Sequence, residues 1–240
     1  MSSKKIRAIS HGSLIIDKIF WEIRSLIEQR QALTEIKIAN RIKTLAKKLG
    51  ASGMAFPPIV SFGSSASEIH HKPTKRRIGK NNFLMLDYGV KVQGFCSDFT
   101  RTLFLGQPTK FQEKIYNIVL KSQLATIKKI TIGTQSDEID FTARHLINQA
   151  GLGKYFIHGT GHGVGRKIHE SPSFKTNTND IVAKDDVVTV EPGIYLPNKF
   201  GVRIEDMVLV SDQPKVFSKI PKDFRNMIIW PSRTPQLFNP

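Results

Sequence analysis

The sequence is poor in cysteine and has no long hydrophobic run. Cys96 is the only cysteine among 240 residues, so no internal disulfide can form and a reducing compartment is indicated. The longest stretch without a charged residue, residues 50–67, is interrupted by glycine and proline and is therefore broken as a membrane span. The basic N-terminus is not followed by an apolar segment, so no signal peptide is visible. We expect a cytoplasmic globular protein without a membrane partner.

Acidic residues are also scarce: 20 Asp and Glu stand against 36 Lys and Arg, which gives a net charge of +16. Such an excess fits a partner that carries phosphates, such as nucleic acid. It equally fits lysines spread over solvated helix faces. The lysines occur as pairs and triplets along the whole chain, and residues 71–77 form the one marked local cluster. We favour solvated faces, and nucleic acid stays an open alternative.

Hydrophobic periodicity predicts helices followed by strand hairpins, twice in succession. Helices are expected at residues 13–31, 34–49, 109–130 and 136–151, with Thr34 and Ser136 as N-caps. Strands are expected at residues 57–63, 82–89, 92–106, 186–195 and 200–210, with one hairpin turning through Gly94. This order predicts an α+β fold in which each half has two helices and an antiparallel hairpin.

Residues 158–170, HGTGHGVGRKIHE, combine three of the seven histidines with four glycines. The histidines are His158, His162 and His169. A helix is disfavoured here, because each glycine costs up to about 1 kcal/mol relative to alanine. We expect an extended strand or an open loop, in which glycine lets the backbone pass close to a bulky group.

Each predicted hairpin carries two acids among apolar residues. Asp87 and Asp98 lie on the first hairpin, and Glu191 and Glu205 on the second. A carboxylate buried in such surroundings requires a cation or close hydrogen bonds. Some of the four can instead face solvent from half-buried strands. A matched pair on each hairpin, together with a histidine among glycines, is better explained by a metal centre.

The composition of this set indicates two metal ions. Four carboxylates are too many for one catalytic zinc, which usually has three protein ligands. They fit two divalent ions about 3.5–4 Å apart that share carboxylates and lower the pKa of a bridging water, so that hydroxide is available near neutral pH. Mn²⁺ is the expected metal, with Co²⁺, Fe²⁺ or Zn²⁺ as alternatives.

Three sequence blocks resemble a known family. LDYGVKVQGFCSDFTRT, HGTGHGVGRKIHESP and VEPGIYLPNKFGVRIED are similar to the signature blocks of the pita-bread metallopeptidases, which include methionine aminopeptidases, Xaa-Pro aminopeptidases and prolidases. The resemblance covers roughly residues 20–210. It implies the pita-bread fold with two halves related by a pseudo-twofold axis, and peptide hydrolysis by a metal-bridging hydroxide.

The resemblance also implies roles for individual residues. The implied metal ligands are Asp87, Asp98, His162, Glu191 and Glu205. Asp98 and Glu205 would bridge both ions, and Glu191 would also carry the proton of the attacking water. The implied contacts to the substrate or the tetrahedral intermediate are His70, His158, His169 and Arg203, and Arg203 could instead orient other groups. His71 is interpreted as a bystander.

The sequence motifs SDFTRT and EPGIY resemble those of the Xaa-Pro branch, so we expect removal of the N-terminal residue from short peptides. A methionine aminopeptidase-like enzyme and a non-catalytic module that binds peptides or nucleic acid are the alternatives. We expect one catalytic domain over residues 1–240, with a core at about 13–212, a C-terminal extension at 213–240 and no separate N-terminal domain. Besides the peptide substrate, a second copy in a homodimer is considered as a partner.

Overall fold

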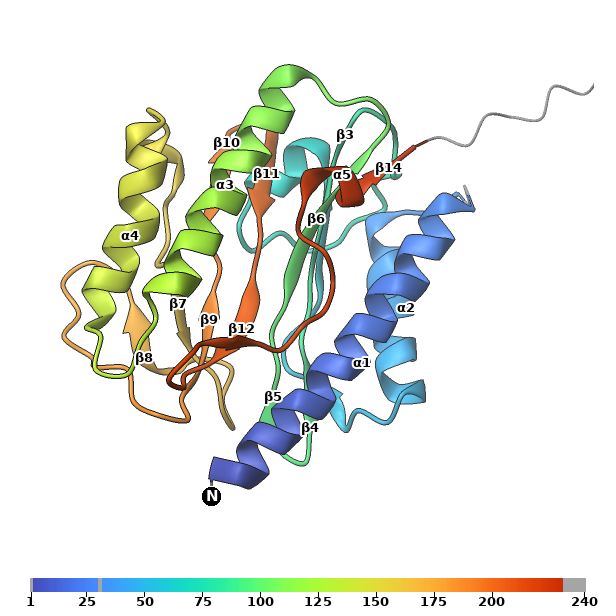
Figure 1. The fold of residues 1–240 in the computed structure, drawn as a ribbon. Helices are drawn as coiled ribbons and strands as arrows, with labels where there is room; N and C mark the ends of the chain where they lie inside the picture. Colours follow the sequence, from blue (N-terminus) through green and yellow to red (C-terminus); the bar gives the residue numbers. More distant parts are fainter. Residues whose placement is uncertain (1, 30–31, 231–240) are drawn as a thin grey trace, which may run out of the picture.

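The computed structural model describes residues 2–29 and 32–230. Its α-helices are α1 (Ser2–Glu28), α2 (Glu35–Lys48), α3 (Lys110–Lys129), α4 (Ser136–Gln149) and α5 (Phe224–Met227), and its 3-10 turns are η1 (Gly63–Ser67) and η2 (Gly153–Tyr155). Its strands are β1 (Gly53–Met54), β2 (Ile59–Phe62), β3 (Asn82–Asp87), β4 (Val90–Val92), β5 (Phe95–Cys96), β6 (Thr100–Leu105), β7 (Gly161–Gly163), β8 (Glu170–Phe174), β9 (Val187–Val190), β10 (Gly193–Leu196), β11 (Phe200–Arg203), β12 (Asp206–Leu209), β13 (Lys215–Val216) and β14 (Ile228–Ile229). Helices α1 and α2 pack on β1, β2, β4 and β5, and α3 and α4 pack on β8–β11 (Figure 1).

Helix α1 begins earlier than the sequence pattern predicted. It starts at Ser2 instead of residue 13, because its apolar face continues through Ala8 and Ile9. Both residues are buried in a cluster with Phe95 of β5. The helix ends at Glu28, and the end expected at residue 31 lies outside the described residues.

Side-chain caps fix the starts of two other helices. Thr34 accepts a hydrogen bond from the Lys37 amide at the start of α2, as predicted. At the start of α3, Thr109 and Gln112 form a reciprocal capping box. The prediction that Ser136 is an N-cap was wrong by one residue, because Ser136 is the first helical residue of α4 and its hydroxyl donates to a threonine side chain.

The first hairpin keeps one register along its whole length. Asn82 pairs with Leu105 at one end of β3 and β6, Asp87 pairs with Thr100 at the other end, and β4 continues the pairing with β5. The turn passes through Gly94, whose φ of 79° is in the left-handed region that glycine adopts without strain. The predicted return strand is divided into β5 and β6 around Asp98.

The second hairpin likewise consists of two consecutive pairs of strands. β9 pairs with β12 and β10 pairs with β11, again in one register, and the strands are interrupted beside Glu191 and Glu205. At both interruptions the backbone bonds to another segment. The amide of Glu191 donates to the Thr160 carbonyl at 2.8 Å, and the amide of Glu205 donates to the Thr100 carbonyl at 3.1 Å. The second of these bonds joins the two hairpins.

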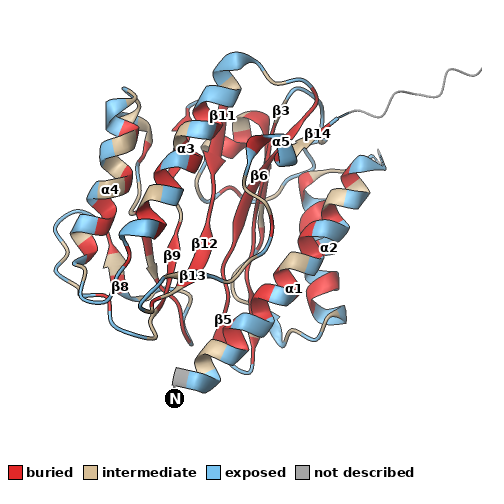
Figure 2. Cartoon of the chain, viewed as in Figure 1, coloured by how far each residue is buried: buried red, intermediate tan, exposed pale blue. Residues whose placement is uncertain are grey.

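The hydrophobic core extends beyond residues 13–212 (Figure 2). The segment after residue 212 contributes Ile220, Phe224, Met227 and Ile229 to the main buried cluster. It also adds β13 beside β12, and β14 in parallel beside β6. Its described part is therefore packed into the fold, and the expected boundary at 213 does not mark the edge of the core.

None of the described helices combines the length and the apolar composition needed to cross a membrane.

Candidate metal centre and substrate cavity

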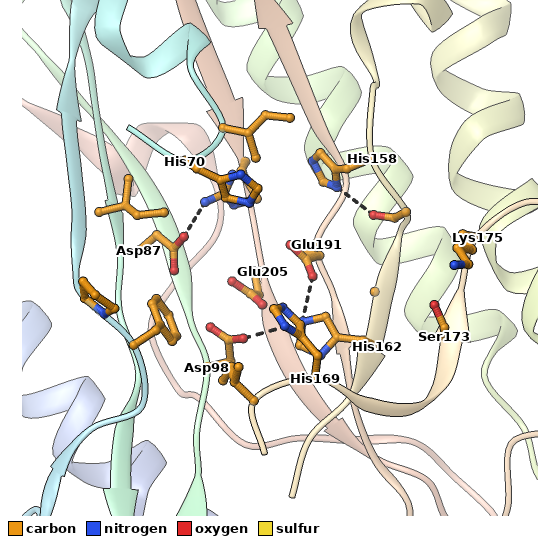
Figure 3. Close-up of a pocket in the computed structure, with 18 of the residues that line it drawn as sticks. His70, Asp87, Asp98, His158, His162, His169, Ser173, Lys175, Glu191 and Glu205 are labelled. Atoms are coloured by element: carbon orange, nitrogen blue, oxygen red, sulfur yellow. Dashed lines mark hydrogen bonds and ion pairs between the residues drawn. The ribbon is translucent and has the colours of Figure 1, made fainter. Parts of the chain in front are cut away.

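The predicted metal ligands meet where the two hairpins are joined. Asp87 ends β3 and Asp98 precedes β6, whereas Glu191 follows β9 and Glu205 precedes β12. His162 is the middle residue of β7, which pairs with β8 and β9. The side chains converge on one region (Figure 3).

Three of these side chains lie within the dimensions of one coordination sphere. Ligand atoms of Asp98, His162 and Glu205 all lie within 4.8 Å of one another. The Nε2 atom of His162 is 3.7 Å from Asp98 Oδ2 and 3.2 Å from Glu191 Oε1. Donors from two hairpins and from β7 therefore converge, as the sequence predicted.

Burial disfavours the charged forms of Asp98 and Glu205. The exposed fractions of Asp98 and Glu205 are 6% and 2%. Burial, and then the neighbouring carboxylates, raise the pKa of Asp98 well above its ordinary value. The same two causes raise the pKa of Glu205 well above its ordinary value. Both groups would therefore be stabilised as carboxylates by additional positive charge.

Glu191 and His162 form a charged pair beside them. Burial acts against the charge of Glu191, but its hydrogen bond with His162 and the charges of His162, His158 and Arg203 lower its pKa to about 2. Burial likewise acts against protonation of His162, but the bond to Glu191 and the charges of Glu191 and Asp98 raise its pKa to about 9. In the metal-free protein this imidazolium therefore supplies part of the missing positive charge.

The Arg203 guanidinium is hydrogen-bonded to other groups of the protein. Its guanidinium is buried and donates to Asp87 Oδ2 at 2.5 Å, to the Tyr195 hydroxyl at 2.8 Å and to Thr100 Oγ1 at 3.2 Å. Tyr195 in turn lies 2.8 Å from Nε2 of His158. Of the two roles considered for Arg203, this geometry favours orienting Asp87 and Tyr195 over direct substrate contact.

Close backbone packing explains why glycine flanks His162. A methyl group added at Gly161 would collide with the carbonyl oxygen of Thr189, and one added at Gly163 would collide with the carbonyl oxygen of Ser171. Strand β7 is thus held between two neighbouring segments at a distance that only glycine permits. The expectation of an extended segment with close backbone approach is confirmed.

All of the predicted site residues line one cavity of about 1030 Å³. The acids and His162 are labelled within it in Figure 3, together with His70, His158 and His169. The ring of His169 is 4.4 Å from that of His162 in an edge-to-face arrangement. Apolar residues form much of the remaining wall, among them Phe56, Ile69, Ile157 and Ile168. The space suits an extended small molecule with apolar groups.

The donor set fits divalent metal ions. It offers four carboxylates and one imidazole, a combination that suits borderline-hard divalent ions. Arg203 and His162 are the cationic partners of these acids, and burial and the neighbouring carboxylates raise the pKa of Asp98 and of Glu205. The site therefore has the ligands and the excess negative charge that such ions require.

Comparison with known proteins identifies the family. Residues 7–212 match the model of metallopeptidase family M24. The chain belongs to this family. An M24 relative from Staphylococcus epidermidis, named an uncharacterized peptidase, is 39% identical over 209 residues, which are 87% of this chain and 57% of the relative.

Solved structures confirm the fold. Prolidase from Thermococcus sibiricus matches with a TM-score of 0.88 and 38% identity, covering 94% of this chain and 61% of that one. Xaa-Pro dipeptidase from Bacillus anthracis matches with a TM-score of 0.90 and 36% identity, covering 94% and 62%. The predicted α+β pita-bread fold and the Xaa-Pro branch of M24 are therefore confirmed. The chain spans about three fifths of the length of each.

Sequence patterns missed several residues that shape this site. Tyr195 was noticed only as part of a sequence block, although its hydroxyl joins Arg203 to His158. Thr100 donates to Glu205 Oε2 at 2.6 Å. His71 was interpreted as a bystander, but it is buried and both of its ring nitrogens face carboxylates, those of Glu35 and Glu68. The adjacent histidines 70 and 71 were a signal, but only the fold shows that both border the cavity and that His71 is the one buried and held by two carboxylates.

Proposed function

We propose that this M24 chain is a dinuclear-metal peptidase that removes the N-terminal residue from short peptides of the Xaa-Pro type. The observation that carries the proposal is the convergence of four carboxylates, three of them buried, with the imidazole of His162 in one cavity large enough for a short peptide. Membership in M24 and the similarity to prolidases and an Xaa-Pro dipeptidase support the same function.

The five predicted ligands would hold two divalent ions, with Mn²⁺ proposed as the metal. Asp98 and Glu205 would be central among the residues that hold these ions, since they come from different hairpins and both lie next to His162. When bound, such ions polarise a carbonyl oxygen and lower the pKa of water. Arg203 keeps the Asp87 carboxylate oriented through its 2.5 Å contact.

Glu191 is proposed to move the proton. Its carboxylate would accept a proton from the attacking water and return it to the leaving amine nitrogen, as general base and then general acid. Thr189 Oγ1 donates to Glu191 Oε1 at 3.2 Å, and this bond orients the carboxylate. The backbone amide of Glu191 is tied to Thr160, so the residue is anchored at two points.

The remaining histidines are proposed to contact the peptide. His70 and His169 are exposed within the cavity, and their ring nitrogens can donate to the oxygen that gains negative charge during attack. His158 is half-buried, and burial lowers its pKa, so a neutral ring would face the residue after the scissile bond.

Digestion of a peptide library with Mn²⁺, read by mass spectrometry, tests the proposal. We expect release of the N-terminal residue from peptides with proline at the second position, such as Arg-Pro-Pro. Faster cleavage of Met-Ala-Ser would favour the methionine aminopeptidase alternative. No cleavage, with less than one Mn²⁺ bound per chain, would favour the binding module.

Variants assign the roles within that assay. Asp98→Ala or Glu205→Ala should abolish hydrolysis and weaken Mn²⁺ binding, measured by titration calorimetry. His70→Ala should lower the rate and leave the metal content unchanged. Glu113→Gln, which removes an exposed carboxylate on α3, is the matched control for loss of charge and should behave as the wild type. Loss of metal in the His70 variant would refute the role given to His70.

A further inference from the structure

Each half of the fold contains a buried carboxylate that lies outside the metal centre. Glu35 is the first residue of α2 and Asp140 lies within α4. Their exposed fractions are 0% and 1%. Neither lines the cavity, and neither takes part in the chemistry proposed above. Both α2 and α4 are the second helix of their half (Figure 1).

Glu35 holds both ends of the segment formed by residues 62–74. Its Oε1 accepts from the Phe62 amide at 2.9 Å and from the Ser65 hydroxyl at 2.6 Å. Its Oε2 accepts from the amide and the hydroxyl of Thr74, at 3.0 and 2.7 Å, and lies 2.9 Å from Nε2 of His71. One buried carboxylate thus binds four residues at the start and the end of this segment.

His70 is carried by that anchored segment. It directly precedes His71, whose Nδ1 lies 2.9 Å from Glu68 Oε2 while its Nε2 faces Glu35. The backbone amide of His71 also donates to the Glu68 carbonyl. The position of the exposed His70 ring in the cavity therefore depends on a neighbour that is fixed on both sides.

Asp140 has the corresponding arrangement in the second half. Its Oδ1 accepts from the amide and the hydroxyl of Thr160, at 3.1 and 2.7 Å. Both of its oxygens accept from the guanidinium of Arg144, one turn further along α4. Arg144 in turn donates to the carbonyls of Phe156 and His158, at 3.0 and 2.9 Å. This pair therefore holds the segment 156–160, which carries His158.

We propose that Glu35 and Asp140 are paired positioning residues, which fix His70 and His158 on the two sides of the substrate cavity. In Figure 3 these two histidines lie on either side of Glu191. The inference rests on the proposed function, in which His70 and His158 contact the peptide. Each carboxylate acts through the segment that carries its own histidine, so each should influence its own histidine and not the other. The segment held by Asp140 also accepts the Glu191 amide at the Thr160 carbonyl.

Hydrogen exchange of the metal-free protein, read by mass spectrometry, tests the anchoring without any activity measurement. Glu35→Gln should increase exchange in peptides that cover residues 62–74, and Asp140→Asn should increase it in residues 156–160. The matched control is Asp17→Asn. Asp17 accepts bonds from Ser218 and Lys219, remote from the cavity, so only that region should respond. Uniform exchange changes, or none, would overturn the proposal.

Steady-state kinetics on an Arg-Pro-Pro peptide tests the consequence. A misplacement of about 1 Å can cost on the order of a hundredfold in rate, so we expect kcat/KM to fall between about tenfold and about a hundredfold. Glu35→Gln should mainly lower kcat, as His70→Ala does. Asp140→Asn should mainly raise KM, the effect we also expect for His158→Ala because His158 is proposed to contact the peptide. Equal changes in both parameters for both variants would indicate a structural role only.

Double variants separate the effects of the two positioning residues, Glu35 and Asp140. Glu35→Gln should have little further effect in a His70→Ala background and its full effect in a His158→Ala background, with the reverse for Asp140→Asn. Full additivity in every combination would refute the proposal. If Glu35→Gln or Asp140→Asn does not fold, Thr74→Val and Thr160→Val replace them in the test. Each removes one hydrogen bond to the corresponding carboxylate. A wild type that cleaves no peptide would refute the proposed function, and hydrogen exchange alone would then decide the anchoring.

Discussion

Replacing Arg101 by methionine should loosen the junction between the two halves. Arg101 is fully buried on β6, and its guanidinium is 2.7 Å from Asp206 on β12. It also donates to the carbonyls of Thr100, at 3.0 Å, and of Glu205, at 2.5 Å. Two further bonds reach carbonyls in the C-terminal segment, those of Ile220 and Pro221. One side chain thus links both hairpins and the C-terminal segment.

The expected loss of unfolding free energy follows from the buried groups that lose Arg101 as a partner. Methionine fills much of the volume, but among the described residues the buried Asp206 carboxylate then keeps Lys222 and Gln123 as its side-chain partners. Removing one partner of a buried ion pair costs about 3–5 kcal/mol of unfolding free energy. For a chain of this length, that loss corresponds to a decrease in Tm of roughly 6–20 °C.

Thermal unfolding followed by circular dichroism, together with urea titration, measures this loss. Arg41→Met is the matched control, because the Arg41 side chain is 44% exposed and its nitrogen lies 4.0 Å from Glu22. Arg41→Met should lower the free energy of unfolding by less than about 1 kcal/mol. A loss for Arg101→Met no larger than that of the control would refute the view that the buried guanidinium joins the halves.

Three other substitutions test local features. Burial opposes protonation of His71, but hydrogen bonding to Glu35 raises its pKa above the ordinary 6.5, so its stabilising effect should be lost as pH rises through the raised value. The stability difference between wild type and His71→Gln, measured by urea unfolding at about pH 6 and about pH 9, should therefore shrink at the higher pH. Gly89→Ala should prevent soluble expression, since its methyl would collide with the carbonyl of Ser97, between β5 and β6. Phe83→Ala, in the centre of an aromatic cluster, should cost about 3–5 kcal/mol in urea unfolding, and a loss below about 1 kcal/mol would contradict the packing.

Local sequence patterns were sufficient for the four long helices and the two hairpins, and they pointed to the proposed metal ligands. Apolar runs and the turn at Gly94 predicted the first hairpin, and the Thr34 cap predicted the start of α2. These features depend on neighbours a few residues apart, so they can be recognised along the chain. Ser136 shows the limit of this reasoning, because a threonine far along the chain uses its hydroxyl.

Tertiary structure alone decided which distant groups meet. The bond between the Glu205 amide and the Thr100 carbonyl joins two hairpins that are far apart in sequence, and with it two pairs of acids become one cluster. Glu35 has no distinctive sequence context, yet burial makes its carboxylate the anchor of a loop that carries His70. Short-range patterns thus predict the ligands of the proposed metal centre. Their arrangement depends on long-range hydrogen bonds and burial, which no short segment contains.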